Sequence, residues 1–196
     1  MRLGRTVIKK YETEMNIYNS AMKLFKENGY DNTTIIEICK SAGISKSTLF
    51  NYYRSKEDIL LKYGKELRKK LIKFNSELPS DLDVQTRIAR LLISDYKNNE
   101  LLKDIGSFQY KEVIKRDWIY LKDEEVRKKN IEFYAHILKK GQENGQINKC
   151  LDCSTIAEII VAVYFNKLNL IINLEHDFNY EEYVYEMLEI IWSGIK

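Results

Sequence analysis

Apolar residues recur at helical spacing along most of this chain, and few residues interrupt them. Ile17, Ala21 and Phe25 mark one broad apolar face, which predicts a helix over residues 10–28 that ends before Gly29. With one Pro and eight Gly in 196 residues, helix breakers are rare, and Lys, Glu, Leu and Ile are abundant. The pattern predicts an all-α protein of about nine helices.

Residues 28–56 hold two short helix patterns joined by a turn that contains Gly43. Glycine tolerates the left-handed backbone that ends a helix. Thr33 and Thr34 are both suited to cap the first of these helices, and the choice between them stays open. Ser45 is placed to cap the second. This is the spacing of a helix-turn-helix, whose second helix is sized to enter a DNA major groove.

The second helix, predicted over residues 46–54, has two unlike sides. Leu49 and Tyr53 stack one turn apart and would pack against the first helix. The opposite side carries groups suited to base edges and thymine methyls, on Ser47, Phe50, Asn51 and Arg54. Four further residues lie at the ends or flanks, where phosphates would be, namely Lys46, Thr48, Tyr52 and Lys56. The pattern favours a helix that reads DNA.

Several positions between Glu14 and Leu61 agree with one known pattern at fixed spacing. They are Thr33-Thr34, Ile38, Ala42-Gly43-Ile44-Ser45-Lys46, Thr48-Leu49-Phe50, Tyr52-Tyr53 and Ser55-Lys56-Glu57. The stretch resembles the signature of the tetracycline-repressor family (TetR/AcrR type) of bacterial transcriptional regulators. The resemblance implies an all-helical homodimer. It also implies an N-terminal three-helix DNA-binding domain and a larger C-terminal domain that binds a small effector.

The resemblance further implies which side chains meet DNA. Phosphate or backbone contacts would come from Thr34, Thr48, Tyr52 and Lys56, and base contacts from Lys46, Ser47 and Asn51. Phe50 stands where the family usually has Tyr, so van der Waals contact remains there but a phenolic hydroxyl does not. The complete predicted DNA-binding set is Thr33, Thr34, Ser45, Lys46, Ser47, Thr48, Phe50, Asn51, Tyr52 and Lys56.

Charge is distributed unevenly along the chain. Residues 1–75 hold 16 Lys and Arg against 8 Asp and Glu, although the formal net charge of the whole chain is only +3. The basic half coincides with the helix-turn-helix, which is an electrostatic footprint for phosphate. Residues 1–10 are expected to form a frayed basic arm that could reach a phosphate or the minor groove.

A long helix is predicted to connect the two halves. Ser55 opens it with a cap, apolar residues recur over residues 57–76, and Leu78-Pro79 ends it. We assign residues 1–56 to the DNA-binding domain, 57–76 to a connecting lever, and 77–196 to an effector-binding and dimerisation domain. Further helices are predicted at residues 84–98, 100–120, 123–144, 153–173 and 180–193.

The last two predicted helices, over residues 153–173 and 180–193, are apolar on more than one side, as Ile160 and Met187 illustrate. A helix that is apolar all round must be covered on every side, and the simplest cover is a second copy of the chain. We therefore expect a homodimer through these two helices. Such a dimer reads a palindromic operator when its recognition helices stand about 34–36 Å apart, one turn of B-DNA.

Aromatic residues gather between the lever and the two closing helices. The candidates for an effector cavity are Phe108, Tyr110, Trp118, Tyr120, Phe133, Tyr134, His136, Tyr164 and Phe165. Aromatic walls with polar tips suit a flat or amphipathic organic molecule. Each of these residues alone belongs more often to an ordinary core. As a set they predict a feasible pocket for a small organic effector, without its identity.

The sequence shows no motif for catalysis, metal binding or cofactor binding, such as a Gly-rich phosphate loop, a nucleophile elbow or HExxH. Cys150 and Cys153 form a CxxC, but neither a second pair of zinc ligands nor the setting of a redox site accompanies it. No segment reads as a signal peptide or a membrane span. We expect a cytoplasmic protein that is not an enzyme and needs no cofactor.

The leading hypothesis is a ligand-responsive transcriptional regulator. It would be a homodimeric repressor that a small organic effector releases from a palindromic DNA operator. The alternative is a helical small-molecule-binding or interaction protein whose helix-turn-helix is only structural. A third hypothesis, architectural DNA binding, would show no preference for an operator. Salt-dependent retention on heparin separates the DNA-binding hypotheses from the alternative.

Overall fold

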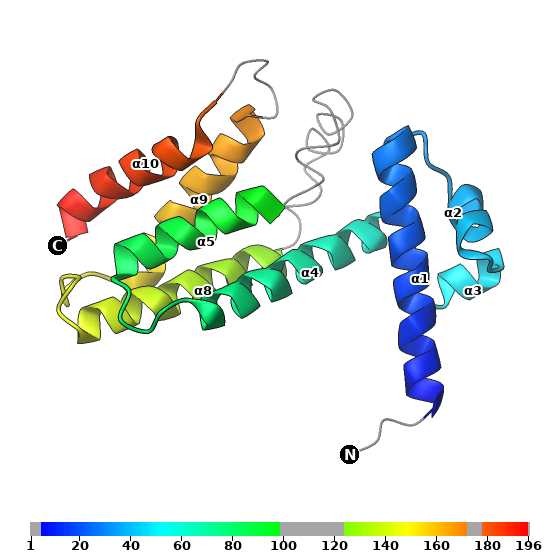
Figure 1. Cartoon of the computed structure of the whole chain (residues 1–196), viewed down its shortest axis with the longest axis horizontal. Coiled ribbons are helices and arrows are strands. Elements are labelled where there is room, and N and C mark those ends of the chain that lie inside the picture. Colours follow the sequence, from blue (N-terminus) through cyan, green and yellow to red (C-terminus); the bar gives the residue numbers. More distant parts are fainter. Residues whose placement is uncertain (1–4, 99–123, 172–177, 196) are drawn as a thin grey trace.

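The computed structural model describes residues 5–98, 124–171 and 178–195, and every regular element in these ranges is an α-helix (Figure 1). The prediction of an all-α protein is thus confirmed for this part of the chain. Three helices form a small bundle at one end, α1 (Arg5–Asn28), α2 (Ile35–Ala42) and α3 (Lys46–Phe50). Five form the rest, α4 (Lys56–Glu77), α5 (Val84–Asn98), α8 (Glu124–Glu143), α9 (Cys153–Ile171) and α10 (Tyr180–Ile195).

Each bundle has its own hydrophobic core, and α4 contributes to both. The smaller core surrounds Phe25, Ile38 and Leu49, and Ile59 at the start of α4 packs into it. Leu71, three turns further along α4, belongs to the larger core instead. Full burial of a side chain of this size contributes about 1.5–3 kcal/mol. The connecting helix is therefore fixed at both ends, which makes it a rigid link between the two bundles.

The long helices begin and end close to where the apolar pattern places them. The helices predicted at residues 84–98 and 123–144 correspond to α5 and α8, and those at 153–173 and 180–193 correspond to α9 and α10. α4 ends at Leu78-Pro79 as predicted, since Pro lacks the N–H that the helix needs. The helix predicted at residues 100–120 lies outside the described residues. Among the described helices, none combines the length and the apolarity that crossing a bilayer requires.

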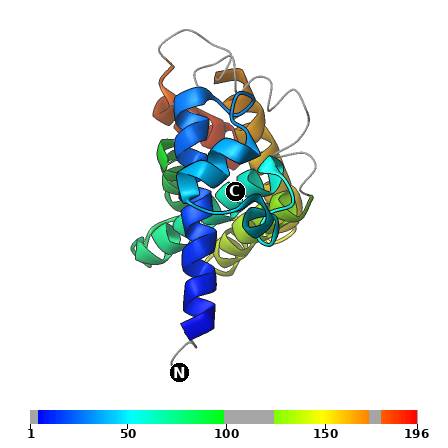
Figure 2. The same ribbon diagram turned by 90° about the vertical axis from the view of Figure 1, so that its right-hand side faces the viewer.

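The first helix starts earlier than predicted. α1 begins at Arg5 rather than near residue 10, so described residues of the expected frayed arm are helical instead. The physical reason is that no Gly or Pro follows Gly4 in this stretch to stop the helix. Figure 2 shows this end of α1 extending well beyond α2 and α3. Its residues from Thr6 to Glu12 are exposed, so the protruding turns have no packing partner among the described residues.

The second helix of the helix-turn-helix is shorter than predicted. α3 spans only Lys46–Phe50, and Asn51 is its C-cap. Tyr52 N and Tyr53 N both donate to Leu49 O, at 2.9 and 3.0 Å, which closes the helix in a tight turn. Tyr53 is 4% exposed, so it keeps the buried position predicted for it although the helix ends before it.

Candidate DNA interface and effector cavity

Thr33 and Thr34 play different parts at the start of α2. The Thr34 hydroxyl accepts a hydrogen bond from Glu37 N at 3.2 Å, and Glu37 Oε2 accepts one from Thr34 N at 2.7 Å. These bonds from Thr34 lower the pKa of the Glu37 carboxyl. Thr33 is fully buried, and its hydroxyl donates to Gly29 O at 2.7 Å. Thr34 is the cap, and the prediction of Thr33 as a DNA-binding residue is wrong because its side chain is inside the fold.

The turn that follows α2 is locked by local hydrogen bonds and by α1. Gly43 has a φ of +65°, the left-handed region in which a side chain would be strained. Ser45 then caps α3, because its hydroxyl accepts a hydrogen bond from Thr48 N at 3.1 Å. Asn16 of α1 donates to Ala42 O at 2.8 Å, just before the turn. The orientation of α3 is thus set by caps on both sides and by a direct bond to α1.

The two sides predicted for α3 are confirmed. Leu49 is fully buried and Tyr53 nearly so, and both pack in the small core. The exposed side chains around this helix are Ser45, Lys46, Ser47, Phe50, Asn51 and Arg54. Phe50 keeps 44% of its surface exposed, although an exposed phenylalanine contributes nothing to folding, and Lys46 Nζ lies 5.8 Å from its ring centroid. The outer side therefore presents cationic, apolar and amide groups together.

Lys56 has a structural position that the sequence did not reveal. Its ammonium donates to Tyr30 O at 2.7 Å and to Thr33 O at 2.8 Å, and lies 4.3 Å from the centroid of the Tyr30 ring. These contacts pin the start of α4 to the loop between α1 and α2. The predicted phosphate contact from Lys56 is therefore at odds with the structure, since the charge that would make it is held by backbone carbonyls.

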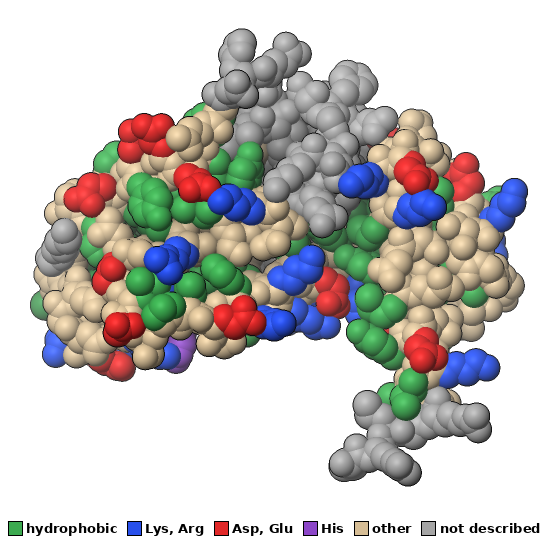
Figure 3. All heavy atoms as spheres, in the orientation of Figure 1, with side chains coloured by type: hydrophobic (Ala, Val, Ile, Leu, Met, Phe, Trp, Pro, Cys, Tyr) green, Lys and Arg blue, Asp and Glu red, His purple; other side chains and the backbone are tan. Residues whose placement is uncertain are grey.

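A hollow lies between the protruding start of α1 and the turn after α3. Its lining consists of Thr6, Lys9, Lys10, Thr13 and Tyr52. The two lysines are exposed and Tyr52 is half-buried, so a predicted DNA-backbone contact stands next to two cations from another helix. Figure 3 shows hydrophobic side chains exposed on the same protruding turns. Sequence reasoning missed this surface because it treated residues 1–10 as a frayed arm.

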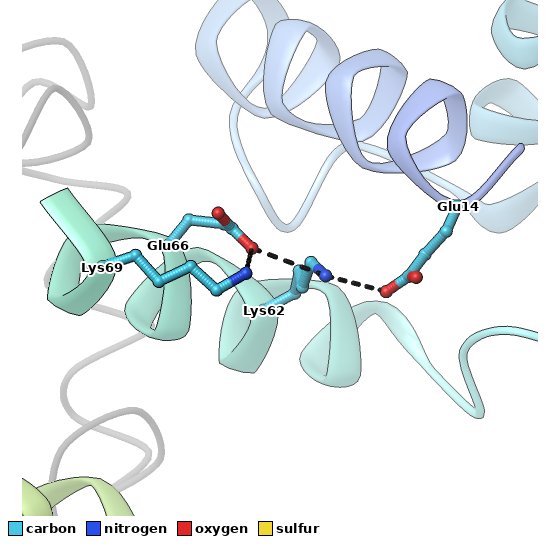
Figure 4. A network of polar contacts seen from close by, with 4 residues as sticks. All are labelled: Glu14, Lys62, Glu66 and Lys69. Atoms are coloured by element: carbon cyan, nitrogen blue, oxygen red, sulfur yellow. Dashed lines mark hydrogen bonds and ion pairs between the residues drawn. The ribbon is translucent and has the colours of Figure 1, made fainter. Parts of the chain in front are cut away.

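Charged side chains join α1 to α4 where the two bundles meet (Figure 4). Lys62 Nζ lies 2.9 Å from Glu14 Oε1 of α1 and 3.5 Å from Glu66 Oε1. Lys69 Nζ lies 2.8 Å from the same Glu66 oxygen. Partial burial opposes ionisation of Glu66, but the two lysines prevail and lower its pKa. The chain of alternating charges links the DNA-binding bundle to the middle of the lever.

A small cavity lies beside α4 within the larger bundle. α4 lines it with Gly64, Leu67, Arg68 and Leu71. The other walls come from α5, α8 and α9, through Asp95, Asn130, Tyr134, Val161, Tyr164 and Phe165. The cavity volume is about 30 Å³, which is room for a water molecule or two but not for an organic ligand. Four helices would have to separate for an effector to enter.

Only some of the predicted pocket residues that the structure describes line the cavity. Tyr134 and Tyr164 line the cavity, and so does Phe165. Phe133 does not line it, and packs edge-on against Tyr134 instead. His136 is exposed, so its prediction as a pocket residue is wrong: on α8 it points away from the buried side that carries Tyr134 and Leu138. Phe108, Tyr110, Trp118 and Tyr120 lie outside the described residues.

The polar group that stands out in the cavity wall is one that the sequence did not suggest. Tyr164 OH donates a short hydrogen bond to Asp95 Oδ2. Burial raises the pKa of Asp95. Burial, followed by the charge of Asp95, also raises the pKa of both Tyr134 and Tyr164. No signal in the sequence marked Asp95, because a single acid in an amphipathic helix normally faces solvent.

With the geometry described, comparison with known proteins shows what the chain is similar to. Residues 17–63, from α1 into α4, match the family model described as bacterial regulatory proteins, tetR family. This match covers the DNA-binding bundle and the start of α4. The chain is similar over its length to the fatty acid metabolism regulator protein of Bacillus subtilis (strain 168). The two are 24% identical over 186 residues, covering 92% of this chain and 94% of the relative.

Solved structures of TetR-family proteins share the fold. A TetR-family transcriptional regulator from Syntrophomonas wolfei is 26% identical, with a TM-score of 0.69 and 94% coverage of both chains. The Thermus thermophilus repressor FadR, solved in complex with lauroyl-CoA, is 23% identical, with a TM-score of 0.66 and coverage of 92% of this chain and 91% of that one. The matched segment and the shared fold are those of DNA-binding transcriptional regulators.

One further surface of the chain is apolar and exposed. Large hydrophobic side chains remain exposed on α9 and α10, with exposed fractions of 48% for Ile159, 49% for Tyr185 and 75% for Ile190. Other residues of the same helices, such as Ile160 and Leu188, are fully buried in the core. Both helices are therefore apolar on two sides, one facing the core and one facing outward.

Proposed function

We propose that the protein is a homodimeric repressor that leaves a palindromic operator when a small organic effector enters the cavity beside α4. The observation that carries the proposal is the double role of α4. Near its start it is bound to the DNA-binding bundle through Ile59 and the Lys62–Glu14 ion pair. In its middle it lines the cavity through Gly64, Leu67 and Arg68. A movement of the cavity wall would therefore move α4, the helix to which the DNA-binding bundle is attached.

The DNA contacts that we propose fall into two classes. Base edges would be read by Lys46, Ser47, Phe50 and Asn51, whose side chains are exposed on α3 and its C-cap. Phosphates would be bound by Thr34, Ser45, Thr48 and Tyr52, which border that surface. Lys9 and Lys10 extend it along α1, since they share a hollow with Tyr52. Thr33 and Lys56 are excluded because their polar atoms are engaged inside the fold.

The dimer that we propose forms through α9 and α10. Ile159, Tyr185 and Ile190 would be covered by the same helices of a second copy, which is how a two-fold interface pairs identical surfaces. The two recognition surfaces would then stand at a fixed separation. Binding to successive major grooves requires about 34–36 Å between them, so the dimer sets the spacing that an operator must match.

Effector binding would act by separating the walls of the cavity. At about 30 Å³ the cavity admits water but not an organic molecule, whereas pockets that hold drug-sized ligands are about 300–1,000 Å³. An occupied cavity therefore implies displaced helices, α4 among them. The ligand favours that state because it binds only there, which is a population shift. Apolar walls at Leu67, Leu71 and Val161 suit an effector with an apolar body.

Binding to DNA from the protein's own promoter region tests the proposal. We expect affinity that falls steeply as salt rises and that exceeds the affinity for random DNA of equal length. Asn51→Ala should cost about 1–3 kcal/mol and relax the preference at one position in each half-site. A protein that shows no salt-sensitive binding at any concentration would be a helical ligand-binding protein with a structural helix-turn-helix. Equal affinity for operator and random DNA would indicate architectural binding instead.

A further inference from the structure

Asp95 places a carboxylate in the wall of an apolar cavity with little to satisfy it. Within the described residues, its only hydrogen bond comes from Tyr164 OH, to one of the two carboxylate oxygens. A carboxylate can accept about four hydrogen bonds, and burial of an unpaired one is costly. Such groups in native proteins usually have a partner, which is often water or a ligand.

One neighbouring hydroxyl is also left without a partner among the described residues. It belongs to Tyr180, whose hydroxyl is buried and accepts or donates no hydrogen bond within the part of the chain that the structure describes. Tyr134 lines the cavity, and the charge of Asp95 acts on the hydroxyls of both Tyr134 and Tyr180. The ring of Tyr180 stacks on Tyr96 with centroids 3.9 Å apart, and packs edge-on to Tyr164 at 6.4 Å. The carboxylate is thus set among aromatic rings and phenol groups in the wall of a mainly apolar cavity.

The cation nearest to this space in the cavity wall is engaged elsewhere. Arg68 also lines the cavity, but its guanidinium donates to Asn130 Oδ1 at 3.3 Å and is attracted by the charge of Glu132. The described residues give Asp95 no ion pair, and its raised pKa is what burial without a cation produces. Among the described residues, the carboxylate of Asp95 is therefore not balanced by a positive charge.

We propose that Asp95 accepts the head group of the effector, and that this effector is a protonated amine on an apolar body. The inference rests on the proposed function, because it concerns the cavity through which the effector would act. An ammonium would supply the missing charge and donate to the free oxygen of Asp95. The rings of Tyr134 and Tyr164, which line the cavity, would add to the attraction, since aromatic rings attract cations. An anionic head group would meet the carboxylate and be repelled.

Three probes that share one apolar body and differ only in the head group test the inference. They are 4-phenylbutylamine, 4-phenylbutanol and 4-phenylbutyrate, added to the full-length protein and followed by calorimetry and thermal shift. We expect the amine to bind at least tenfold more tightly than the alcohol and the carboxylate not to bind. Asp95→Asn should remove most of the preference for the amine and leave the affinity for the alcohol nearly unchanged.

Two further variants separate recognition from folding. Tyr180→Phe removes a buried hydroxyl that makes no hydrogen bond to the described residues, so it should fold normally and keep the amine preference. Tyr164→Phe removes the one bond to Asp95 but keeps its charge, so the amine preference should also persist. The inference is overturned if the amine fails to bind at millimolar concentration, if the carboxylate binds as well as the amine, or if Asp95→Asn weakens all probes equally. Binding of the effector-free protein to its operator is measured separately. A failure of the DNA-binding proposal can therefore be told apart from a failure of the amine proposal.

Discussion

Lys62 of α4 lies between two carboxylates and holds Glu14 of α1 at 2.9 Å, although the two residues are 48 positions apart. The side chains are only 16% and 31% exposed, so solvent screens this pair less than an ordinary surface ion pair. The pair is a direct bond between the helix that buttresses the recognition surface and the helix that lines the cavity. Removing it should loosen the coupling between the two.

We predict that Lys62→Met and Glu14→Gln each lower the free energy of unfolding by about 1 kcal/mol. The double variant should lose less free energy of unfolding than the two single variants added together. Urea denaturation of the three variants measures this cycle. The effector concentration needed for release from DNA should rise in all three. Fully additive losses would show that the two side chains do not interact.

A second prediction concerns the protruding start of α1. Because Lys9 and Lys10 line a hollow with Tyr52, the double variant Lys9→Gln/Lys10→Gln should weaken binding to operator and random DNA equally. The slope of log affinity against log salt should become less steep by about two. The matched control is Lys65→Gln/Lys70→Gln, which changes the net charge equally at exposed positions of α4. If the control weakened DNA binding equally, the effect would come from net charge and not from the position of Lys9 and Lys10.

The parts of the fold that depend on neighbours in sequence were predictable. Thr34, Gly43 and Ser45 set their helix boundaries through bonds to residues three or four positions away, which a sequence displays directly. The end of α3 was not predictable, because Tyr53 has a buried position whether the helix stops at Phe50 or continues to residue 54. Neither was the inward position of Asp95 or the outward position of His136, since each depends on which neighbours pack against its helix.

The position of Lys56 also depends on contacts between distant parts of the chain, and it gives a third prediction. Because its ammonium satisfies Tyr30 O and Thr33 O, Lys56→Met should destabilise the DNA-binding bundle by about 1–3 kcal/mol. The salt slope of DNA binding should stay unchanged. Chemical denaturation and a salt titration of DNA affinity measure the two quantities, with Lys70→Met as the control. Unchanged stability together with a slope less steep by about one would restore Lys56 as a phosphate contact.

The capping box predicts how acid affects stability. Hydrogen bonds from Thr34 hold the pKa of Glu37 below its ordinary value of 4.5. A carboxyl whose pKa is lower in the folded state than in the unfolded state stabilises the fold at every pH above its unfolded-state pKa. This stabilisation is lost as the pH falls through the folded-state pKa. Stability measured from pH 7 to pH 2 should therefore fall less steeply below about pH 4.5 in Glu37→Gln than in the parent. Parallel curves would mean that Glu37 titrates alike in both states.

Gly64 offers a test of the cavity as the site of control. It lies within α4 and lines the cavity, and a Cβ at this position would have no atom within 4 Å. Gly64→Ala should therefore raise the free energy of unfolding by about 0.5–1 kcal/mol, because glycine is a poor helix former and the added methyl meets open space.

The larger substitution Gly64→Leu should fill the cavity and hold its walls in the closed arrangement. DNA affinity should be retained, whereas release by effector should be impaired, since the ligand would have to displace a side chain as well as separate the helices. A reporter behind the protein's own promoter would then stay repressed under conditions that induce the parent. Normal induction by Gly64→Leu, with intact folding and DNA binding, would place the effector site elsewhere in the larger bundle.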